Sequence, residues 1–325
     1  MTKAIRVYEV GGPDVMQLEE LEPGQPGEGE VTIRNHAIGL NYIDVYFRTG
    51  SYPPPSLPFT PGLEGAAVVT AVGPGVSDFK LGDRVAYAAV PMGAYCQERV
   101  MPAHRLLNVP DGIDDNTAAA MMLKGMTAEY LLRRTYPVKR GDTILFHAAA
   151  GGVGLIACQW AHHLGVTVIG TVGSETKAEL AARHGCDFPI LYKDEDFVER
   201  VRQITDGKGV DVVYDSVGKH TFLKSIDCLR PLGMMVSFGQ SSGVVPPLDI
   251  GLLSAKGSLF LTRPTLMTYT QKREDLVASA RELFDVVLAG AVSIEVEQTY
   301  PLERVADAHR DLESRRTVGS TVLLP

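Results

Sequence analysis

Ile144-Leu-Phe-His-Ala-Ala-Ala-Gly-Gly-Val-Gly154 is the stretch of this 325-residue chain that decides its fold. The apolar run predicts a buried strand, the glycines predict a tight turn, and the residues from Val153 onward predict a helix. A helix that begins in such a turn directs its first N–H groups at an anion, most often a dinucleotide pyrophosphate. Alanine replaces the first glycine of the usual G-x-G-x-x-G pattern. A glycine turn that only packs against its own sheet is the alternative.

From this stretch onward, strand-like runs alternate with helical patterns. Further strands are expected at residues 166–172, 188–191, 210–215, 233–239 and 257–262, and helices at 176–184, 194–205 and 221–229. This alternation predicts right-handed βαβ crossovers and an α/β fold with a Rossmann-type, doubly wound parallel sheet. Helices at 271–289 and 302–313 and strands at 292–298 and 319–324 close the chain.

The first 120 residues have a different pattern. Short alternating runs at 4–10, 30–39, 65–72 and 84–89 are separated by glycine and proline, which predicts an all-β region forming a sandwich or a partly open barrel. The proline-rich segment 50–58 is expected to be a stiff surface loop. Helical spacing at 118–123 and 127–136 leads into the strand at Ile144.

Composition restricts the function classes. The formal net charge of −8 argues against nucleic acid as the main partner, and no apolar run is long enough for a membrane span. The four cysteines are scattered without metal-ligand spacing, which favours free thiols in a reducing, cytoplasmic compartment. The N-terminus lacks the apolar core of a signal peptide.

The end of the second strand of the alternating region indicates the cofactor. NAD-binding domains place a carboxylate there to bind the ribose hydroxyls, but this strand ends in Thr171-Val-Gly-Ser174. Lys177 follows in the first turn of the next helix, where it is suited to bind a 2′-phosphate. The sequence therefore predicts NADPH. A solvated helix lysine is the alternative for Lys177, and Glu175 beside it is a mild counter-argument.

A set of motifs in a fixed order resembles one known family. The motifs are Asn41-Tyr-Ile-Asp44, Pro61-Gly-Leu-Glu-Gly65, Gly82-Asp-Arg-Val85, Lys124-Gly-Met-Thr127, Gly151-Gly-Val-Gly154, Tyr214-Asp-Ser-Val-Gly218 and Ser237-Phe-Gly239. Together they resemble the zinc-free NADPH:quinone oxidoreductases, the ζ-crystallin-like group of the medium-chain dehydrogenase/reductase superfamily. The resemblance covers essentially the whole chain.

The resemblance implies a GroES-like, partly open β-barrel catalytic domain, residues 1–124 and 266–325, and an NADPH-binding Rossmann domain, residues 125–265. It implies a homodimer paired through edge strands of the Rossmann sheets, with 257–262 as the candidate edge. Zinc-dependent relatives carry a cysteine ligand where this chain has Asn41 and a histidine ligand where it has Leu63. Glu64 alone cannot hold a catalytic zinc, so no metal is expected.

The resemblance also implies a set of site residues. The candidate catalytic residues are Tyr46, Tyr52, Lys124 and Arg263. The candidate cofactor-binding residues are Asn41, Asp44, Thr127, Ala150, Gly151, Gly152, Val153, Gly154, Gly173, Ser174, Lys177, Tyr192, Ser216, Gly218, Phe238, Gly239, Ser241 and Arg315. The tyrosines are expected to stack on, or donate to, a quinone. The two cations are expected to balance charge on the acceptor oxygen or the cofactor.

Each assignment has a structural alternative. Asn41 and Asp44 also suit an Asx-type turn, the tyrosines ordinary packing, and Lys124 a surface ion pair. An inter-subunit salt bridge is the rival role for Arg263, and the neighbouring Arg316 competes with Arg315. All eight histidines are expected to be structural or solvated.

Three activities remain open at this point. The main expectation is reduction of a small-molecule quinone by NADPH without a metal. An NADPH-dependent enone or 2-alkenal reductase would need the same flat, apolar pocket. A ζ-crystallin-like RNA-binding or structural protein is the alternative from a different class, and the net negative charge argues against RNA.

Overall fold

The computed structural model describes residues 1–88 and 90–325, so Ala89, the last residue of the strand expected at 84–89, lies outside the described residues. The chain divides into two compact units. Unit 1 comprises Met1–Met126, Thr270–Leu288 and Ile294–Pro325. Unit 2 comprises Thr127–Tyr269 and Ala289–Ser293.

Unit 1 is built on a seven-stranded sheet. Its strands are β14 (Val296–Pro301), β15 (Ser320–Leu324), β3 (Glu30–Leu40), β4 (Glu64–Val72), β5 (Arg84–Ala88) and β7 (Leu107–Asn108) in spatial order, with β6 (Glu98–Pro102) paired to β3. All pairs are antiparallel except β14 with β15. A separate hairpin, β1 (Thr2–Val7) with β2 (Met16–Leu21), completes the β structure. The expected β-rich N-terminal region is confirmed.

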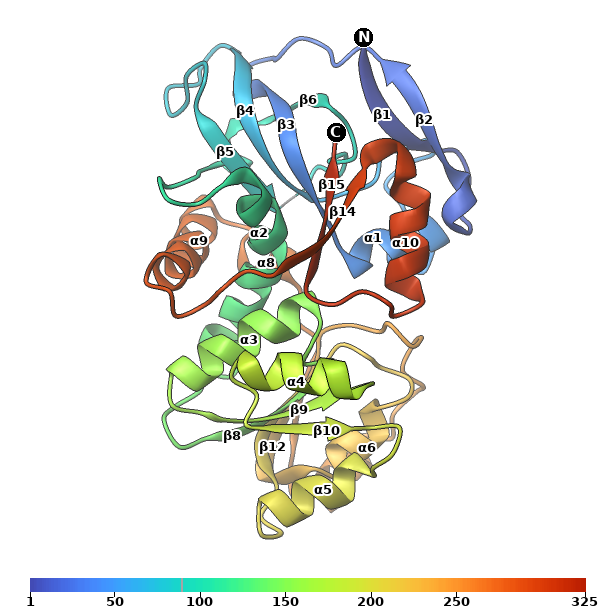
Figure 1. Cartoon of the computed structure of the whole chain (residues 1–325), viewed down its shortest axis with the longest axis vertical. Coiled ribbons are helices and arrows are strands. Elements are labelled where there is room, and N and C mark those ends of the chain that lie inside the picture. Colours follow the sequence, from blue (N-terminus) through green and yellow to red (C-terminus); the bar gives the residue numbers. More distant parts are fainter. Residues whose placement is uncertain (89) are drawn as a thin grey trace. The chain divides into compact units, whose positions relative to one another are not determined.

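The helices of unit 1 join distant parts of the chain. Helix α1 (Tyr42–Thr49) follows β3 directly, and helix α10 (Val305–Glu313) comes from near the C-terminus. Both lie beside the N-terminal hairpin (Figure 1). The core includes Ile5 and Ile33 from the N-terminal strands and Leu302 and Val305 from the C-terminal region, all essentially inaccessible to solvent.

One long helix replaces the two expected around residue 124. Helix α2 (Asp115–Glu129) runs through Gly125 and continues as the π-helix Tyr130–Thr135. A Cβ at Gly125 would overlap the side chain of Leu283 on helix α9 (Arg273–Leu288). The glycine therefore permits close packing of α9 and does not end the helix.

Unit 2 contains a six-stranded, fully parallel sheet. The strand order is β10 (Phe188–Leu191), β9 (Thr167–Val172), β8 (Thr143–His147), β11 (Val210–Asp215), β12 (Leu229–Ser237) and β13 (Phe260–Thr262). Every strand is joined to the next by a crossover, which is the doubly wound arrangement. The expected α/β fold class is confirmed. The last strand is shorter than expected, because helix α7 (Gly251–Ala255) and a turn occupy the residues before it.

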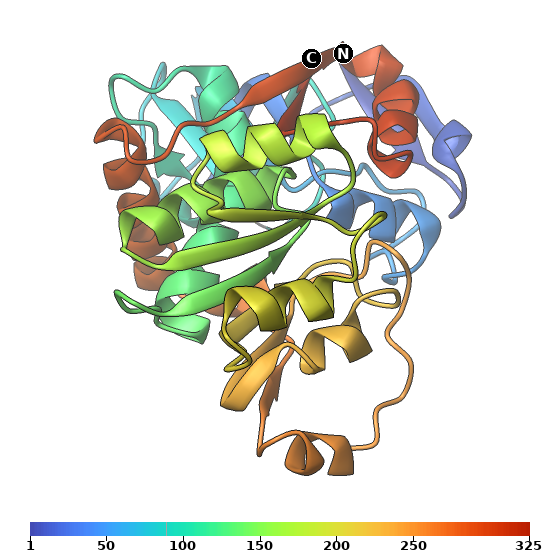
Figure 2. The same cartoon turned by 60° about the horizontal axis from the view of Figure 1, so that its bottom comes forward.

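Helices cover both faces of the parallel sheet. Helices α3 (Gly152–His163) and α4 (Glu175–Arg183) lie on one face, and α5 (Phe197–Ile204) and α6 (Phe222–Ile226) lie on the other (Figures 1 and 2). Because both faces are covered, the strands are largely apolar, as in Leu145, Ile169 and Val213. Within the described part of the chain, no helix is both long and apolar enough to cross a bilayer.

Candidate functional site

The parallel sheet has its topological switch point between β8 and β11, where the strand order reverses. In open α/β sheets, ligands bind outside the carboxyl ends of the strands at this point. Two of the predicted cofactor-binding segments follow these two strands directly: Gly151–Gly154 after β8, and Ser216–Gly218 after β11. The fold therefore brings both segments to one edge of the sheet.

The glycine turn after β8 presents backbone N–H groups. Ala148 has a φ of 57°, a left-handed conformation that reverses the chain, and Gly151 is the N-cap of α3. None of the described side chains caps this helix, so its first-turn N–H groups can bind an anion. Ala150 is buried at the turn, and Val153 lies in the first turn of the helix. A dinucleotide pyrophosphate fits this donor set.

Gly154 is required for close packing. A Cβ at this position would overlap the carbonyl oxygen of Ala148 and lie 2.6 Å from that of Ala149. A side chain would push the start of α3 away from the turn. The third glycine therefore holds the helix against the strand, which is the role this position has in dinucleotide-binding turns.

The end of β9 brings together four predicted residues. The Ser174 hydroxyl accepts a hydrogen bond from the Lys177 backbone N–H at 3.4 Å and so caps α4. A Cβ at Gly173 would lie 3.0 Å from the Tyr192 hydroxyl, which shows that this hydroxyl lies over the strand end. Ser174 is exposed and Tyr192 is 39% exposed. Glu175 is the only carboxylate among residues 171–177.

The loops after β11 and β12 interlock through backbone contacts. Ser241 donates its backbone N–H to the Ser216 carbonyl at 3.0 Å, and a Cβ at Gly239 would lie 2.7 Å from that same oxygen. Gly218 has a φ of 86°. Asp215 holds the first loop, since its carboxylate accepts from the Gly218 N–H and from other groups of that loop. Phe238 packs near Phe146, with ring centroids 5.8 Å apart.

Arg263 stands just after β13 and fixes the end of β12. Its Nη1 donates to the carbonyl oxygens of Ser237 and Gly239, both at 2.9 Å. The guanidinium therefore stabilises the turn that carries Phe238 and Gly239.

In unit 1, a buried cluster forms around Glu64 at the start of β4. This glutamate is 0% exposed. Its carboxylate accepts from the Asn41 amide at 2.6 Å and from the Leu123 backbone N–H at 2.7 Å, and it pairs with the Lys124 ammonium at 3.3 Å. Lys124 is 6% exposed, so the ion pair is shielded from water. Three motifs that are far apart in the sequence thus meet in one cluster.

A chain of hydrogen bonds leads away from Asp44 on helix α1. Oδ2 of Asp44 accepts from the Asn41 N–H at 2.9 Å and from the Tyr95 hydroxyl at 2.8 Å. The Tyr95 oxygen lies 3.1 Å from Nε2 of His309. Arg48 donates to Nδ1 of His309 at 3.0 Å and to Glu313 at 2.7 Å.

The directions of these bonds follow from chemistry. An arginine can only donate, so Nδ1 of His309 is an acceptor and Nε2 carries the proton. Nε2 then donates to the Tyr95 oxygen, whose own proton goes to Asp44. This leaves Oδ1 of Asp44 buried without a hydrogen-bond partner among the described residues.

Burial is the largest cause of the pKa shifts in this network. Burial raises the pKa of Asp44 to about 7, against the lowering effects of the Asn41 N–H and the Tyr95 hydroxyl. Burial, together with the Arg48 charge, lowers the pKa of His309 to about 3. The pKa of Tyr95 is raised well above its usual value, first by burial and then by the Asp44 charge. At neutral pH, the lowered pKa keeps His309 neutral, and the raised pKa allows Asp44 to hold a proton.

The predicted tyrosines lie in an aromatic cluster on and after helix α1. Ring centroids of Tyr46 and Tyr52 are 4.9 Å apart, and those of Tyr42 and Tyr46 are 5.4 Å apart. Phe47 contacts Tyr52 edge-on at 5.8 Å. Tyr46 is 8% exposed, whereas Tyr52 is only partly buried. Packing therefore fixes both rings.

The remaining predicted residues lie elsewhere. Arg316 pairs with Asp311 at 2.8 Å, whereas Arg315 has a left-handed backbone with a φ of 60° after α10. Thr127 is buried in α2. His147 ends β8 and is buried between the hydroxyls of Thr171 and Ser225. Among the described residues, no group of three His, Cys, Asp or Glu side chains is placed to hold a metal ion.

Sequence reasoning missed several members of the unit 1 network. Tyr95, His309, Arg48 and Glu313 were not among the predicted site residues, and Glu64 was considered only as a metal ligand. Tyr95 and His309 are separated by 214 residues, so no local spacing signals their contact. An acid between apolar residues, as in Leu63-Glu64-Gly65, was the one available signal that Glu64 is buried.

Comparison with protein families gives two matches. Residues 27–141 match the alcohol dehydrogenase GroES-like domain, and residues 152–283 match the zinc-binding dehydrogenase family.

Full-length relatives are similar to the chain throughout. A quinone oxidoreductase of Pseudomonas aeruginosa is 54% identical, with all of both chains covered, and quinone oxidoreductase 1 of Escherichia coli K12 is 49% identical over the same extent. A 2-haloacrylate reductase of a Burkholderia species is 50% identical, over 100% of this chain and 99% of its own. The crystal structure of Escherichia coli quinone oxidoreductase complexed with NADPH superposes with a TM-score of 0.98, covering 99% of this chain and 100% of that one.

Proposed function

Since the chain belongs to the quinone oxidoreductase family of the medium-chain dehydrogenase/reductase superfamily, we propose that it is an NADPH-dependent, zinc-independent quinone reductase. The observation that carries this proposal is similarity over the full length, at 49% identity, to a quinone oxidoreductase whose structure is a complex with NADPH. The uncapped, glycine-rich start of α3 supports it, because this feature suits a pyrophosphate.

Residues of unit 2, the proposed NADPH-binding Rossmann domain, would hold the cofactor. The N–H groups at Gly151–Gly154 suit the pyrophosphate, and Ser174, Lys177 and Tyr192 suit the 2′-phosphate. The interlocked loops at Ser216, Gly218, Phe238, Gly239 and Ser241 supply backbone donors and acceptors at the same sheet edge. When bound, NADPH supplies the hydride.

Residues of unit 1, the proposed catalytic domain, would orient the reactants and balance charge. The proposed cofactor contacts also include Asn41, Asp44 and Thr127, the last of which is the first residue of unit 2. Arg315 remains a proposed phosphate contact. Lys124 is a cation fixed by Glu64, and Tyr46 and Tyr52 offer hydroxyl groups on packed rings. Arg263 remains a proposed catalytic cation of unit 2, although its bonds to Ser237 and Gly239 favour a positioning role. Asp44 can hold a proton at neutral pH on its buried carboxyl group.

A second candidate activity is reduction of a conjugated C=C bond. The specific observation in its favour is the 2-haloacrylate reductase that is 50% identical over the full chain. Both reactions add hydride to an electron-poor conjugated acceptor. They differ in where the second proton is needed, because a carbanion requires a better placed donor than a quinone oxygen.

The test is NADPH oxidation by protein treated with a chelator, with 1,2-naphthoquinone, 2-hexenal and 2-chloroacrylate as acceptors. We expect the highest kcat/KM with the quinone and no loss of activity after chelation. Turnover with the alkenes alone would replace the main proposal by the second one. Loss of quinone turnover after chelation, restored by zinc, would contradict metal independence.

We further propose a homodimer formed through β13. This strand is an edge of the parallel sheet and carries Phe260, 57% exposed, and Leu261, 38% exposed. Exposed apolar residues on an unpaired edge favour strand pairing with a second copy. Light scattering should give a dimer for the native chain and a monomer for Leu261→Pro. A native monomer would contradict the proposal.

Cytoplasmic location is also a proposal. All four cysteines are free and buried in this structure. A chain with no use for disulfides suits a reducing compartment. Cell fractionation with a periplasmic and a cytoplasmic marker tests it, and recovery with the periplasmic marker would contradict it.

A further inference from the structure

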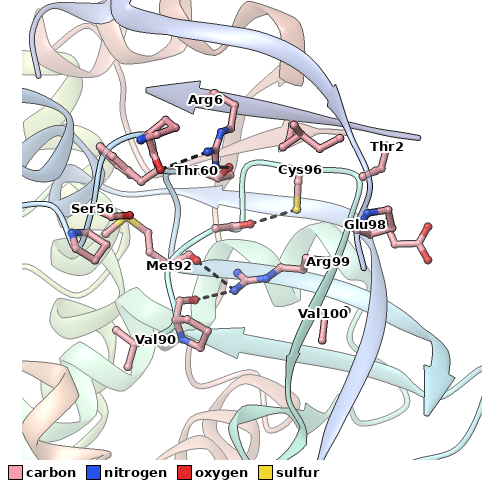
Figure 3. A pocket seen from close by; sticks show the side chains of 18 of the residues that line it. Thr2, Arg6, Ser56, Thr60, Val90, Met92, Cys96, Glu98, Arg99 and Val100 are labelled. Carbon is pink, nitrogen blue, oxygen red and sulfur yellow. Dashed lines mark hydrogen bonds between the residues drawn. The ribbon is translucent and has the colours of Figure 1, made fainter. Parts of the chain in front are cut away.

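The cavity of unit 1 drawn in Figure 3, about 600 Å³ in volume, engages its polar groups mainly within the chain. Arg99 donates to the carbonyl oxygens of Pro91 and Met92, and its guanidinium carbon lies 5.7 Å from the centroid of the Tyr87 ring. The arginines and glutamates of the lining balance in charge. The cavity therefore offers a charged ligand no specific site.

A different buried polar network, in unit 2, is centred on His147, the last residue of β8. His147 is 0% exposed and lies between two hydroxyls: its Nδ1 is 2.9 Å from Oγ1 of Thr171, and its Nε2 is 2.8 Å from Oγ of Ser225. The Phe197 ring meets the imidazole edge-on, with ring centroids 5.1 Å apart. Both ring nitrogens are thus engaged, and packing fixes the orientation of the ring.

The directions of these hydrogen bonds follow from the Ser225 hydroxyl. Its single proton points at the Thr221 carbonyl oxygen, at 2.9 Å, or at the Asp215 carboxylate, at 3.5 Å, and both are acceptors. Ser225 therefore accepts from Nε2–H of His147, and Nδ1 accepts from the Thr171 hydroxyl. Burial lowers the pKa of His147 against the raising effect of the Asp215 charge, which agrees with a neutral ring.

His147 stands where the pairing of β8 with β11 ends. The last paired residues of these two strands are Phe146 and Tyr214. On the other side, β8 stays paired with β9 as far as His147 and Thr171, and the Ala149 N–H donates to the Thr171 carbonyl at 3.1 Å. Backbone hydrogen bonds thus hold the β9 side of this strand end, whereas the side chain of His147 reaches the β11 side.

The bond to Ser225 positions the loop that follows β11. Ser225 lies on α6, which begins where that loop ends. The Asp215 carboxylate closes the loop by accepting from the Gly218 N–H at 3.0 Å and from the Thr221 hydroxyl at 2.7 Å. His147 itself directly precedes the glycine turn. One imidazole therefore joins the two backbone segments that are proposed to hold the cofactor.

We propose that His147 is a positioning residue of the cofactor site, which fixes the spacing between the glycine turn and the loop after Asp215 through its bond to Ser225. This inference rests on the proposed NADPH-dependent function. The pyrophosphate, which the glycine turn is proposed to bind, is common to NADPH and NADH. His147 therefore sets the affinity for both cofactors by the same factor and does not discriminate between them.

The test is fluorescence titration of the full chain with NADPH and with NADH. His147→Asn, whose shorter amide reaches only the Thr171 side, and Ser225→Ala should each weaken both cofactors about tenfold, because a buried hydrogen bond between the two segments is lost. His147→Gln places an amide N–H near the Nε2 position and should recover most of the affinity. In steady-state kinetics with a quinone, the KM for NADPH should rise while kcat stays within about twofold.

Thr171→Val is the matched control, since it removes a hydrogen bond of the same ring on the side that the β8–β9 pairing already fixes. It should lower the urea midpoint of unfolding about as much as Ser225→Ala and leave both affinities unchanged. A purely structural histidine predicts instead that affinity falls in proportion to stability in every variant. Native affinity in Ser225→Ala, or an equal loss of affinity in Thr171→Val, would overturn the proposal.

Further readouts separate this proposal from that of the reductase. Nitrogen NMR of the native chain should show the His147 proton on Nε2, and a proton on Nδ1 would overturn the proposal because Ser225 would then have to donate. A native chain that binds NADPH but reduces no quinone would refute the reductase activity alone, with the affinity pattern of the variants still deciding the role of His147. A native chain that binds neither cofactor would overturn both.

Discussion

The two candidate regions of this protein are built from different materials. In unit 2, the sheet edge uses backbone N–H groups, glycines and small polar residues, as in Gly151–Gly154 and at Ser216. In unit 1, the candidate region is formed instead by charged side chains that the fold has removed from water, above all Glu64 with Lys124. A site made of backbone groups tolerates a change of side chain as long as the backbone keeps its conformation. A buried charge network tolerates neither the loss of a charge nor an unpaired partner.

The largest effect is expected from breaking the buried ion pair. Glu64→Gln leaves the Lys124 ammonium buried without a counter-charge, and this should lower the free energy of unfolding by about 3–5 kcal/mol. Calorimetry or urea unfolding measures the loss. Glu303→Gln, at an exposed position of unit 1, is the matched control and should change stability by less than about 0.5 kcal/mol. The double variant Glu64→Gln with Lys124→Met should recover part of the loss. If Glu64→Gln were as stable as the native chain, the buried charges of unit 1 would not be the sensitive feature that distinguishes this region from unit 2.

The next largest effect concerns pH, because Asp44 and His309 act in opposite directions. The raised pKa of Asp44 contributes stability that is complete below its unfolded pKa of about 3.8 and is lost as pH rises toward 7. The lowered pKa of His309 contributes stability that is complete above about 6.5 and is lost as pH falls toward 3. Between about pH 4 and 6.5, the two contributions nearly cancel in the native chain.

Replacing Asp44 or His309 singly should reveal how the stability contributed by the other group depends on pH. Across that pH range, Asp44→Asn should lose about 1.4 kcal/mol of stability per pH unit of acidification, relative to the native chain. His309→Gln, which keeps a donor and an acceptor, should lose a similar amount per unit of rising pH. Urea unfolding at pH 4.5, 5.5 and 6.5 compares the three proteins. Parallel pH profiles for all three would show that this network does not titrate as described.

A smaller effect is expected at the backbone site. Gly154→Ala should weaken NADPH binding about 10- to 100-fold, because overpacking of about 1–3 kcal/mol shifts the start of α3. Gly12→Ala is the matched control, since its φ of −69° suits alanine and nothing lies within 4 Å of the added Cβ. Fluorescence titration with NADPH gives the affinities. Native affinity in Gly154→Ala would show that this turn is not tightly constrained.

The smallest effect sharpens the cofactor assignment. Lys177→Ala should raise the KM for NADPH about tenfold and leave that for NADH nearly unchanged, because one charge-assisted contact is removed. Lys208→Ala, at an exposed position of unit 2, should leave both values as they are. Steady-state kinetics with the two cofactors decides between the phosphate contact and a solvated lysine. Equal changes for NADPH and NADH would assign Lys177 to helix stability.

How far the sequence predicts each region follows from the same difference in construction. The glycine turn, Ser174 and the loop after Asp215 are local patterns, so their positions at the ends of parallel strands could be predicted from spacing alone. The contact of Asn41 with Glu64 and that of Tyr95 with His309 depend on which strands pair and where α10 packs. Propensities carry no information about such distant pairs.

Local patterns also misled in one place. Helical spacing suggested two separate helices, at 118–123 and 127–136, whereas α2 continues through Gly125, where Leu283 packs against the glycine. Tertiary packing overrode the low helix propensity of glycine. The same glycine lies next to Lys124, so the packing of α9 helps to fix the backbone that carries the buried cation.

Gly39 restricts the order in which residues of the Glu64 cluster can be substituted. The space that a Cβ at residue 39 would need is taken by the Glu64 carboxylate and the Ala119 carbonyl oxygen. A side chain can therefore be gained at position 39 only after position 64 has become smaller and the α2 backbone at Ala119 has shifted, and restoring Glu64 afterwards would be blocked. Mutational paths through this pair run in one direction. Descendant chains should keep Gly39 and Glu64 together or lose Glu64 before Gly39.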